Sequence, residues 1–313
     1  MCVYKKVQIT ARKKAFSMTS DDKKMQREYE YCRAGVDKRL EDFFIEHENY
    51  SRLLESMRYS LLGGGKHIRA VMCLKFCEAA GGDMEKTLDA ACAIEMLHTY
   101  SLIHDDLPCM DNDNMRRGKP SNHIAYDVFT ATLAGDALQA AAFETLSHAL
   151  LPSATIVKMS RIFSQAAGQH GICGGQYLDV RSEGKRLTHE ELEEIHKLKT
   201  AALMSAAAQM GVISAEGAHE QEKAAEDYAC AIGLAFQIRD DILDCVSTSE
   251  NLGKPAGSDK EKEKTTYATL FGLSECEALI RSETEKAVTA IKGKFDDTDF
   301  LVWFAHMLAD RKK

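Results

Sequence analysis

Proline and glycine, the residues that most often interrupt helices, are scarce in this sequence. The chain of 313 residues contains four prolines and 20 glycines, whereas alanine, leucine, methionine, glutamate and lysine, which favour helices, are abundant. A hydrophobic content of 45% is enough to build a sizeable buried core. The composition therefore predicts an all-α protein.

Long apolar runs and an excess of positive charge are also missing. No uninterrupted apolar stretch reaches the ~18 to 20 residues that a membrane-spanning helix needs. The net charge is −8 and the calculated pI is near 5.8, which disfavours nucleic-acid binding as the main role of the chain. We therefore expect a protein that neither spans a membrane nor binds nucleic acid.

Paired cysteine motifs are absent as well. The ten cysteines include no Cys-x-x-Cys pair, and Cys73, Cys77 and Cys92 fall within apolar helical runs. This pattern indicates reduced, packed thiols rather than a disulfide or zinc framework. We expect a cytoplasmic protein on this ground.

The N-terminal segment has no acidic residue up to position 20. Its basic residues are compatible with a transit peptide, but it lacks the apolar core of a secretory signal. A disordered extension, or an upstream start with Met18 as a second initiator, is the interpretation that we favour. We expect residues 1–24 to be this extension and residues 25–313 to form one domain. The basic residues are Lys5, Lys6, Arg12, Lys13 and Lys14.

Helical periodicity extends over most of the chain. Polar or glycine-containing breaks separate the helical runs, and no β-type alternation persists. A polar loop is expected over 109–122, and a charged stretch, "GKPAGSDKEKEKTT", precedes the C-terminal helices. The expected helices cover 25–46, 70–80, 84–107, 124–150, 153–183, 188–213 and 218–245.

The stretch "SLIHDDLPCMD" places three carboxylates directly after an apolar helical run. These are Asp105, Asp106 and Asp111, and apolar residues such as Leu102 and Leu107 surround them. Like charges so close together repel one another, and more strongly when water is excluded. A positively charged ligand is therefore expected at this position.

A second acidic cluster, "FQIRDDILD", lies 135 residues further on. Asp240 and Asp244 are four apart and so share one face of a helix, with Asp241 beside them. Solvated acidic helix faces are the alternative, but apolar residues flank both clusters. Carboxylates suit hard cations, and Mg²⁺ keeps coordination positions for water and phosphate oxygens. The two clusters together predict a polyphosphate bound through magnesium.

Basic residues accompany both acidic clusters. Arg116 and Arg117 follow the first, and Lys254 and Lys264 follow the second. Arginine binds phosphate oxygens in a bidentate manner, and lysine supplies a point charge.

The segment "GGGKHIR" adds Lys66 and Arg69 at a glycine-rich helix start, where free backbone N–H groups also favour anions. It is not a phosphate-binding loop of the Walker type, because His67 follows the lysine. Taken alone, this segment could equally be a turn with a surface lysine.

These motifs occur in the order found in one known family. Together with "EMLHTYSLIHDDLPCMDNDNMRRGKP", "LAGDALQ", "GGQYLDV", "KLKTAAL" and "LGKPAGSD…KTTY", they make the chain resemble the trans-isoprenyl diphosphate synthases of the polyprenyl synthetase family over roughly residues 27–311. The spacing DDxxxxD resembles that of short-chain enzymes of bacteria and plants. The resemblance implies a single-domain orthogonal helical bundle around a central cavity and a homodimer.

The resemblance also implies roles for individual residues in an allylic diphosphate site. Magnesium, about three ions per site, or Mn²⁺ in its place, would bridge the aspartates to the diphosphate. Gln176 and Asp179 would line the space between this site and the next. The metal ligands would be Asp105, Asp106, Asp111, Asp240, Asp241 and Asp244, and the site would be completed by Arg116, Lys199, Thr200, Gln237, Lys254 and Lys264.

A second site, for isopentenyl diphosphate, would be formed by Lys66, Arg69, His98 and Arg117. Without the resemblance, His98 would be interpreted as a packed helix-interior histidine. Its position seven residues before Asp105 places both on one helix face. The chain departs from the usual Lys-Arg-x-Arg-Pro pattern, because it has His67 and Ala70, and Asn114 replaces an acid.

The implied reaction joins isopentenyl diphosphate head to tail to dimethylallyl or geranyl diphosphate. Tyr100, five residues before Asp105, resembles the farnesyl-forming pattern, although Ser101 points nearer to the aspartate face. We therefore expect a farnesyl diphosphate synthase. The alternatives are a geranylgeranyl diphosphate synthase, a terpene cyclase, which needs no second diphosphate site, and a non-catalytic regulatory subunit, which would be expected to lack acidic ligands.

Overall fold

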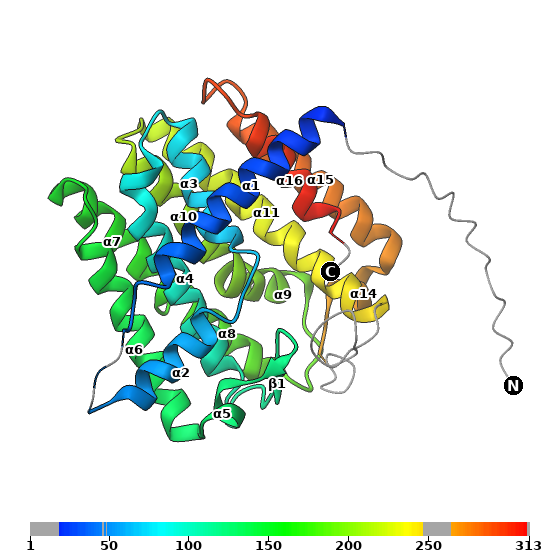
Figure 1. Cartoon of the computed structure of the whole chain (residues 1–313). Helices are drawn as coiled ribbons and strands as arrows, with labels where there is room; N and C mark the ends of the chain where they lie inside the picture. Colours follow the sequence, from blue (N-terminus) through cyan, green and yellow to red (C-terminus); the bar gives the residue numbers. More distant parts are fainter. Residues whose placement is uncertain (1–18, 46, 48, 247–263, 312–313) are drawn as a thin grey trace, which may run out of the picture.

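A computed structural model describes residues 19–45, 47, 49–246 and 264–311 of the chain (Figure 1). Within these ranges, helices dominate and a single two-stranded hairpin is present. The predicted all-α fold is confirmed. The elements are α1 (Ser20–Leu40), α2 (Ser51–Leu61), α3 (Ile68–Ala79), α4 (Met84–Asp105), β1 (Met115–Arg116), β2 (Lys119–Pro120), α5 (Asn122–Ala125), α6 (Val128–Ser147), α7 (Ser153–Ala167), α8 (Ile172–Ser182), α9 (His189–His196), the π-helical turn η1 (Lys197–Ala201), α10 (Ala202–Ser214), α11 (His219–Val246), α14 (Tyr267–Phe271), α15 (Leu273–Ile291) and α16 (Asp299–Ala309).

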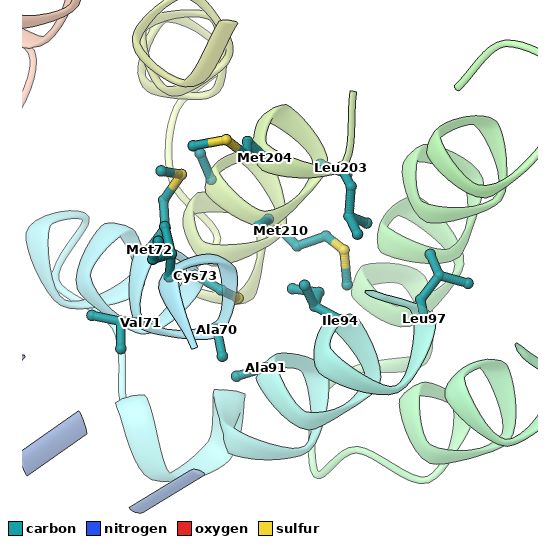
Figure 2. Packing of buried hydrophobic residues seen from close by; sticks show 14 of the residues in the cluster. Ala70, Val71, Met72, Cys73, Ala91, Ile94, Leu97, Leu203, Met204 and Met210 are labelled. Carbon is teal, nitrogen blue, oxygen red and sulfur yellow. The ribbon is translucent and has the colours of Figure 1, made fainter. Parts of the chain in front are cut away.

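Helix α4 lies at the centre of the bundle and packs against α3, α6 and α10. It is apolar on nearly all sides because neighbouring helices surround it. Figure 2 shows Ile94 and Leu97 of α4 facing Met210 and Leu203 of α10, and all four side chains are buried. This packing holds the C-terminal end of α4, where the first acidic cluster begins.

Helices α3 and α10 approach each other closely because of Gly211. A Cβ atom at this position would lie 2.2 Å from the carbonyl oxygen of Cys73. The residue therefore has to be glycine for the two backbones to keep this separation. The contact completes the core on the side of α4 that Figure 2 shows.

Helix α11, drawn in yellow in Figure 1, lies between α10 on one side and α15 and α16 on the other. Its buried residues occur along most of its length, from Glu222 to Asp244. Helices η1 and α9 also contact it near the C-terminal half. These contacts bury Asp241 and Asp244 of the second acidic cluster, whereas the Asp240 side chain is 41% exposed.

Several expected helix boundaries differ from the observed ones, among them the end of the helix expected over 25–46, which lies at Leu40, and the helix expected over 124–150, which is divided into α5 and α6. Helix α1 begins at Ser20 rather than near Met25, because Thr19 and Asp22 form a capping box. The helix expected over 153–183 is two helices, since the chain turns between Ala167 and Ile172. Gly171 is required in this turn, because a Cβ atom there would lie 2.1 Å from the carbonyl oxygen of Ala166.

The polar loop expected over 109–122 contains the hairpin of β1 and β2. Arg117 and Gly118 form its turn with φ values of 52° and 76°, as a two-residue hairpin of this kind requires. Because the chain turns here, the side chains of the consecutive residues Arg116 and Arg117 point in different directions.

Several predictions concern segments outside the described residues. Met18 and Lys254 lie there, as does most of the charged stretch before the C-terminal helices. Over the described residues, no helix is both long and apolar enough to cross a membrane. The described cysteines are free thiols, and Cys73, Cys77 and Cys92 are buried as expected.

Candidate active site

One cavity of about 740 Å³ collects most of the predicted site residues. It lies where the ends of α4 and α8, the turn η1, the β1–β2 hairpin, the N-terminus of α3 and the C-terminal part of α11 meet. The structure thus brings together residues that are up to 198 positions apart, from Lys66 to Lys264. The predicted residues that line it are Lys66, Arg69, His98, Asp105, Asp111, Arg116, Arg117, Asp179, Lys199, Thr200, Gln237, Asp240, Asp241, Asp244 and Lys264.

The first acidic cluster is formed by the end of α4 and the turn that follows. Asp105 is the last residue of α4, and its carbonyl oxygen accepts a hydrogen bond of 2.9 Å from the N–H of Asp111. This turn brings both residues to the cavity. Burial raises the pKa of Asp105, while Lys199 lowers it. A bound cation would compensate the charges of these two neighbouring acids, which burial disfavours.

Asp106 has a different position from the other predicted metal ligands. Its carboxylate is 2% exposed and does not line the main cavity. Arg116 binds it in a bidentate manner, with Nε 3.0 Å and 3.2 Å from the two oxygens. Burial raises the pKa of Asp106 to about 6, although Arg116 opposes the shift. In this structure, Asp106 thus holds Arg116 at the edge of the cavity.

The second acidic cluster lies on α11. The oxygens of Asp241 accept hydrogen bonds from the Gln237 amide at 3.3 Å and from the Tyr267 N–H at 2.8 Å. Asp240 is 2.6 Å from Nη2 of Arg311. Oδ1 of Asp244 is buried and has no hydrogen-bond partner among the described residues. An unsatisfied carboxylate oxygen that faces other acids fits a cation ligand.

A pair of lysines lies between the two acidic clusters. The Nζ atoms of Lys199 and Lys264 are 2.7 Å and 3.2 Å from one oxygen of Asp179, and they approach Asp105 and Asp111 at 3.9 Å and 3.8 Å. Burial alone would raise the pKa of Asp179, but the two lysines lower it to about 2. The pKa values of both lysines are raised by the acids despite burial. Both ammonium groups are therefore charged and close enough to bind one diphosphate.

The local backbone explains how Lys199 reaches this position. The helix expected over 188–213 is interrupted by η1, a wider π-helical turn that contains Lys199 and Thr200. Such turns redirect side chains and are frequent at functional sites. Gly175 of α8 permits the contact, because a Cβ atom there would lie 2.3 Å from the backbone nitrogen of Lys199.

The opposite end of the cavity is basic. Nη1 of Arg69 is 3.4 Å from Nε2 of His98, and Arg117 donates a hydrogen bond to the carbonyl of Gly64. Burial lowers the pKa values of Arg69, Arg117 and His98. His98 is therefore neutral at pH 7, whereas the arginines remain charged. Two guanidinium groups close enough to repel each other favour an anionic ligand.

A comparison with protein families matches residues 50–300 to the model of the polyprenyl synthetase family. The chain belongs to this family. Among similar proteins, the geranylgeranyl diphosphate synthase of Cyanophora paradoxa is 48% identical over 234 residues, which cover 74% of this chain and 78% of that protein. The chloroplastic geranylgeranyl pyrophosphate synthase of Capsicum annuum is 43% identical over 83% of this chain and 71% of that protein.

Solved structures agree with the family assignment. The geranyltransferase of Legionella pneumophila has a TM-score of 0.84 and 32% identity, and the alignment covers 94% of this chain and 99% of that one. An FPP/GFPP synthase of Zymomonas mobilis has a TM-score of 0.82 and 31% identity over 91% of this chain and 99% of that one. The predicted isoprenoid synthase fold is thereby confirmed, and this polyprenyl synthetase is a prenyltransferase of isoprenoid biosynthesis.

The donor set of this polyprenyl synthetase fits magnesium. Its candidate ligands are carboxylates, which suit a hard cation. Within the described ranges, no three acidic, histidine or cysteine side chains are close enough together to hold one ion by themselves. Ions at this site would thus complete their coordination with water or substrate oxygens, as Mg²⁺ usually does.

The residues predicted to set the product length lie outside the cavity lining. The Tyr100 side chain is buried in the core, and its hydroxyl is 3.3 Å from Sγ of Cys173. The hydroxyl of Ser101 donates to the carbonyl oxygen of His98 at 2.8 Å. Gln176, expected between the two sites, is also absent from the lining, and its buried amide has no partner among the described residues.

Sequence reasoning missed several residues of this polyprenyl synthetase site. Arg311 pairs with Asp240, and its guanidinium lies 3.4 Å from the centre of the Phe236 ring. The basic ending "DRKK" was the available signal. Glu95 and His196 also line the cavity, and neither belongs to a motif that distinguishes it from an ordinary helix residue.

Proposed function

We propose that this protein condenses isopentenyl diphosphate head to tail with an allylic diphosphate. The observation that carries the proposal is the presence of two chemically distinct groups of charged residues around one cavity. One combines Asp105 and Asp244 with Lys199 and Lys264, and the other is the basic group around Arg69. Two substrates that each bear a diphosphate account for both groups.

The first group supports binding of the allylic substrate. Magnesium would be held by the aspartates of both clusters, and when bound it supplies positive charge that neutralises the diphosphate. Lys199 and Lys264 donate hydrogen bonds to the diphosphate oxygens as the allylic C–O bond breaks, and Arg116 adds a third cation. Their charges stabilise the leaving group, and the buried cavity limits access of water to the allylic cation.

The second group supports binding of isopentenyl diphosphate. Lys66, Arg69 and Arg117 bind its diphosphate, and neutral His98 offers an N–H or a lone pair beside Arg69. The double bond then attacks the allylic carbon, and one proton leaves the resulting cation. The released diphosphate accepts this proton, so that no side-chain base is required.

For the product we propose geranylgeranyl diphosphate. The support is that relatives with this name are 43% to 48% identical to the chain, whereas the solved structures titled FPP/GFPP synthase and putative farnesyl-diphosphate synthase are 31% and 36% identical. This corrects our preference for farnesyl diphosphate, which depended on Tyr100.

Farnesyl diphosphate remains the second candidate product. The specific observation in its favour is the buried Tyr100 ring, which lies on α4 beneath Asp105 and packs against the ring of His104 at 5.6 Å. If this ring closes the apolar end, Tyr100→Ala extends the product from fifteen to twenty carbons. Tyr177→Ala is the matched control, because Tyr177 is 63% exposed on α8.

The decisive experiment incubates the purified protein with isopentenyl diphosphate, magnesium and, in turn, dimethylallyl, geranyl and farnesyl diphosphate. Chromatography of the products gives their length. We expect a twenty-carbon product and no turnover with a chelator. Cyclised hydrocarbons, or no product from any pair, would contradict the proposal, and the latter result would favour a regulatory subunit. Replacement of Mg²⁺ by Mn²⁺ is expected to keep activity.

We also propose that the protein is a homodimer. Exposed apolar side chains at the start of α6 support this, among them Phe129, which is 73% exposed, and Leu133. Light scattering should give twice the chain mass of 34.8 kDa, and Phe129→Glu should reduce it.

For the cellular location, the name of the Capsicum annuum relative supports a plastid rather than the cytoplasm that we expected. Microscopy of a fluorescent fusion of the whole chain would distinguish a plastid location from a cytoplasmic one.

A further inference from the structure

His67 has an unusual backbone conformation next to the basic end of the cavity. It is the residue that precedes α3, with φ 45° and ψ 39°, in the left-handed region that side chains other than glycine rarely adopt. Its side chain is 3% exposed. Such a conformation persists only where surrounding contacts hold it.

The contacts that hold His67 come from two helices. Its Nδ1 is 2.8 Å from Oε2 of Glu95 on α4, and its Nε2 is 2.9 Å from Oδ1 of Asp37 on α1. Both carboxylates can only accept, so both ring nitrogens donate when the ring carries two protons. The imidazolium therefore joins α1, α3 and α4 at one point.

Further hydrogen bonds connect this point to the substrate cavity. The second oxygen of Glu95 accepts a hydrogen bond of 3.2 Å from the N–H of Ala70, and the hydroxyl of Tyr29 donates to the carbonyl of Lys66. The segment before and after His67 is thus fixed at several backbone atoms. Lys66 and Arg69, the two cations of this segment, line the cavity.

We propose that protonated His67 is a positioning residue, which fixes the backbone so that Lys66 and Arg69 bind the diphosphate of isopentenyl diphosphate. The inference rests on the proposed function. It goes beyond the proposed function because it assigns a role to His67, which occupies the position where the family pattern usually has arginine, through its hydrogen bonds to Glu95 and Asp37.

The proton on His67 makes this positioning sensitive to pH. Glu95 from α4 and Asp37 from α1 face the ring, and they raise its pKa above the usual 6.5 although burial opposes this. Because the pKa of His67 is raised in the folded protein, its contacts with both carboxylates are intact below pH 6.5. They are lost as the pH rises through the pKa of the folded state. A neutral ring would then present a lone pair to one of the two carboxylates. Tyr29, Arg69 and His98 are the other titratable groups nearby.

Lys66 titrates in the same direction and has to be separated from His67. Burial lowers its pKa, so that it too loses charge at high pH. His67→Arg separates the two effects, because arginine keeps its charge over this range. His67→Asn is the complementary variant, since asparagine tolerates the left-handed conformation but carries no charge.

The test measures KM for isopentenyl diphosphate and for the allylic substrate from pH 6 to 9. His67→Asn should raise the first KM about tenfold, as expected for loss of a charged hydrogen bond, and leave the second unchanged. In the wild type, KM for isopentenyl diphosphate should rise with pH. In His67→Arg, KM for isopentenyl diphosphate should be low and should rise less with pH than in the wild type. His306→Asn, an exposed histidine on α16, is the control.

Calorimetry with isopentenyl diphosphate keeps this inference separate from the proposed function, because it needs no turnover. Weaker binding to His67→Asn than to the wild type, with unchanged circular dichroism, supports the positioning role. Equal affinity of folded wild type, His67→Asn and His67→Arg at every pH would overturn it, even if the enzyme is active. An inactive wild type that still shows the predicted change in affinity would leave the positioning role standing while the proposed reaction fails.

Discussion

The two ends of the cavity differ in the arrangement of their charged side chains. Around Asp105 and Asp244, acids and lysines alternate, and Asp179 holds Lys199 and Lys264 in place. Around Arg69, basic side chains predominate, because Lys66, Arg69 and Arg117 line this end of the cavity together with His98 and Glu95. The basic end can therefore bind an anion directly, whereas the acidic end needs additional cations before an anion can bind. For the proposed reaction, we therefore expect magnesium to be needed for binding the allylic diphosphate rather than isopentenyl diphosphate.

Removing an acid from the acidic end of the cavity should have the largest effect. We expect Asp244→Asn to lower kcat/KM by a factor of about 10³, because one charged ligand and part of the electrostatic stabilisation are lost. The magnesium concentration required for half-maximal rate should increase. Steady-state kinetics at varied magnesium measures both. Asp227→Asn, also on α11 but 52% exposed, should have normal kinetics, and equal losses in both variants would argue against a metal site.

At the basic end, Glu95 should make the free energy of unfolding depend on pH in the acidic range. The hydrogen bond and charge of His67 outweigh burial and lower the pKa of Glu95 from 4.5 to about 2. Because the pKa of Glu95 is lower in the folded protein than in the unfolded chain, the charged carboxylate stabilises the fold above pH 4.5. This contribution is lost as the pH falls toward 2. The shift corresponds to about 3 kcal/mol. Urea unfolding of the wild type and Glu95→Gln at pH 7, 4 and 3 measures it, and parallel pH profiles would contradict it.

Removing a lysine from the acidic end tests whether its charge stabilises the leaving group. Lys199→Ala should lower kcat/KM for the allylic substrate by a factor of about 10², through loss of a charged donor to the leaving group. Product formation at varied allylic diphosphate is the measurement. Lys197→Ala is a close control, because Lys197 belongs to the same π-helical turn but is 61% exposed. If both variants lose activity equally, the turn rather than the charge is responsible.

A smaller and more selective effect is expected at the basic end. Arg117→Gln should raise KM for isopentenyl diphosphate about tenfold and leave the allylic KM nearly unchanged, since one phosphate contact is removed. Initial rates with each substrate varied in turn show this. Lys119→Gln, an exposed residue of the same hairpin, should behave as the wild type. An increase in both KM values for Arg117→Gln would mean that the two ends are not separate sites.

Much of this site could be predicted from the sequence, because its charges lie in short motifs within apolar helices. Asp105, Asp240 and Asp244 could be recognised by spacing alone, and the all-helical fold followed from composition and periodicity. Lys199 and Thr200 could be assigned only through the family resemblance. Nothing in the letters "KLKT" shows that the helix widens there.

The remaining features depend on contacts between distant segments. The pairing of Asp106 with Arg116 and of His67 with Glu95 cannot be recognised from a sequence pattern, because no motif marks either residue as the partner of the other. Arg311 reaches Asp240 from the end of the chain. Helix ends were misplaced where a capping box or a glycine turn, rather than hydrophobic periodicity, decides the boundary.

The close approach at Gly175 has a practical consequence for redesigning this protein. Backbone atoms of α8 and η1 touch there, so the spacing of Asp179 and Lys199 is set by main chains and does not depend on side chains in the apolar part of the cavity. An engineer could therefore exchange apolar side chains around the cavity while Asp179 and Lys199 keep their spacing.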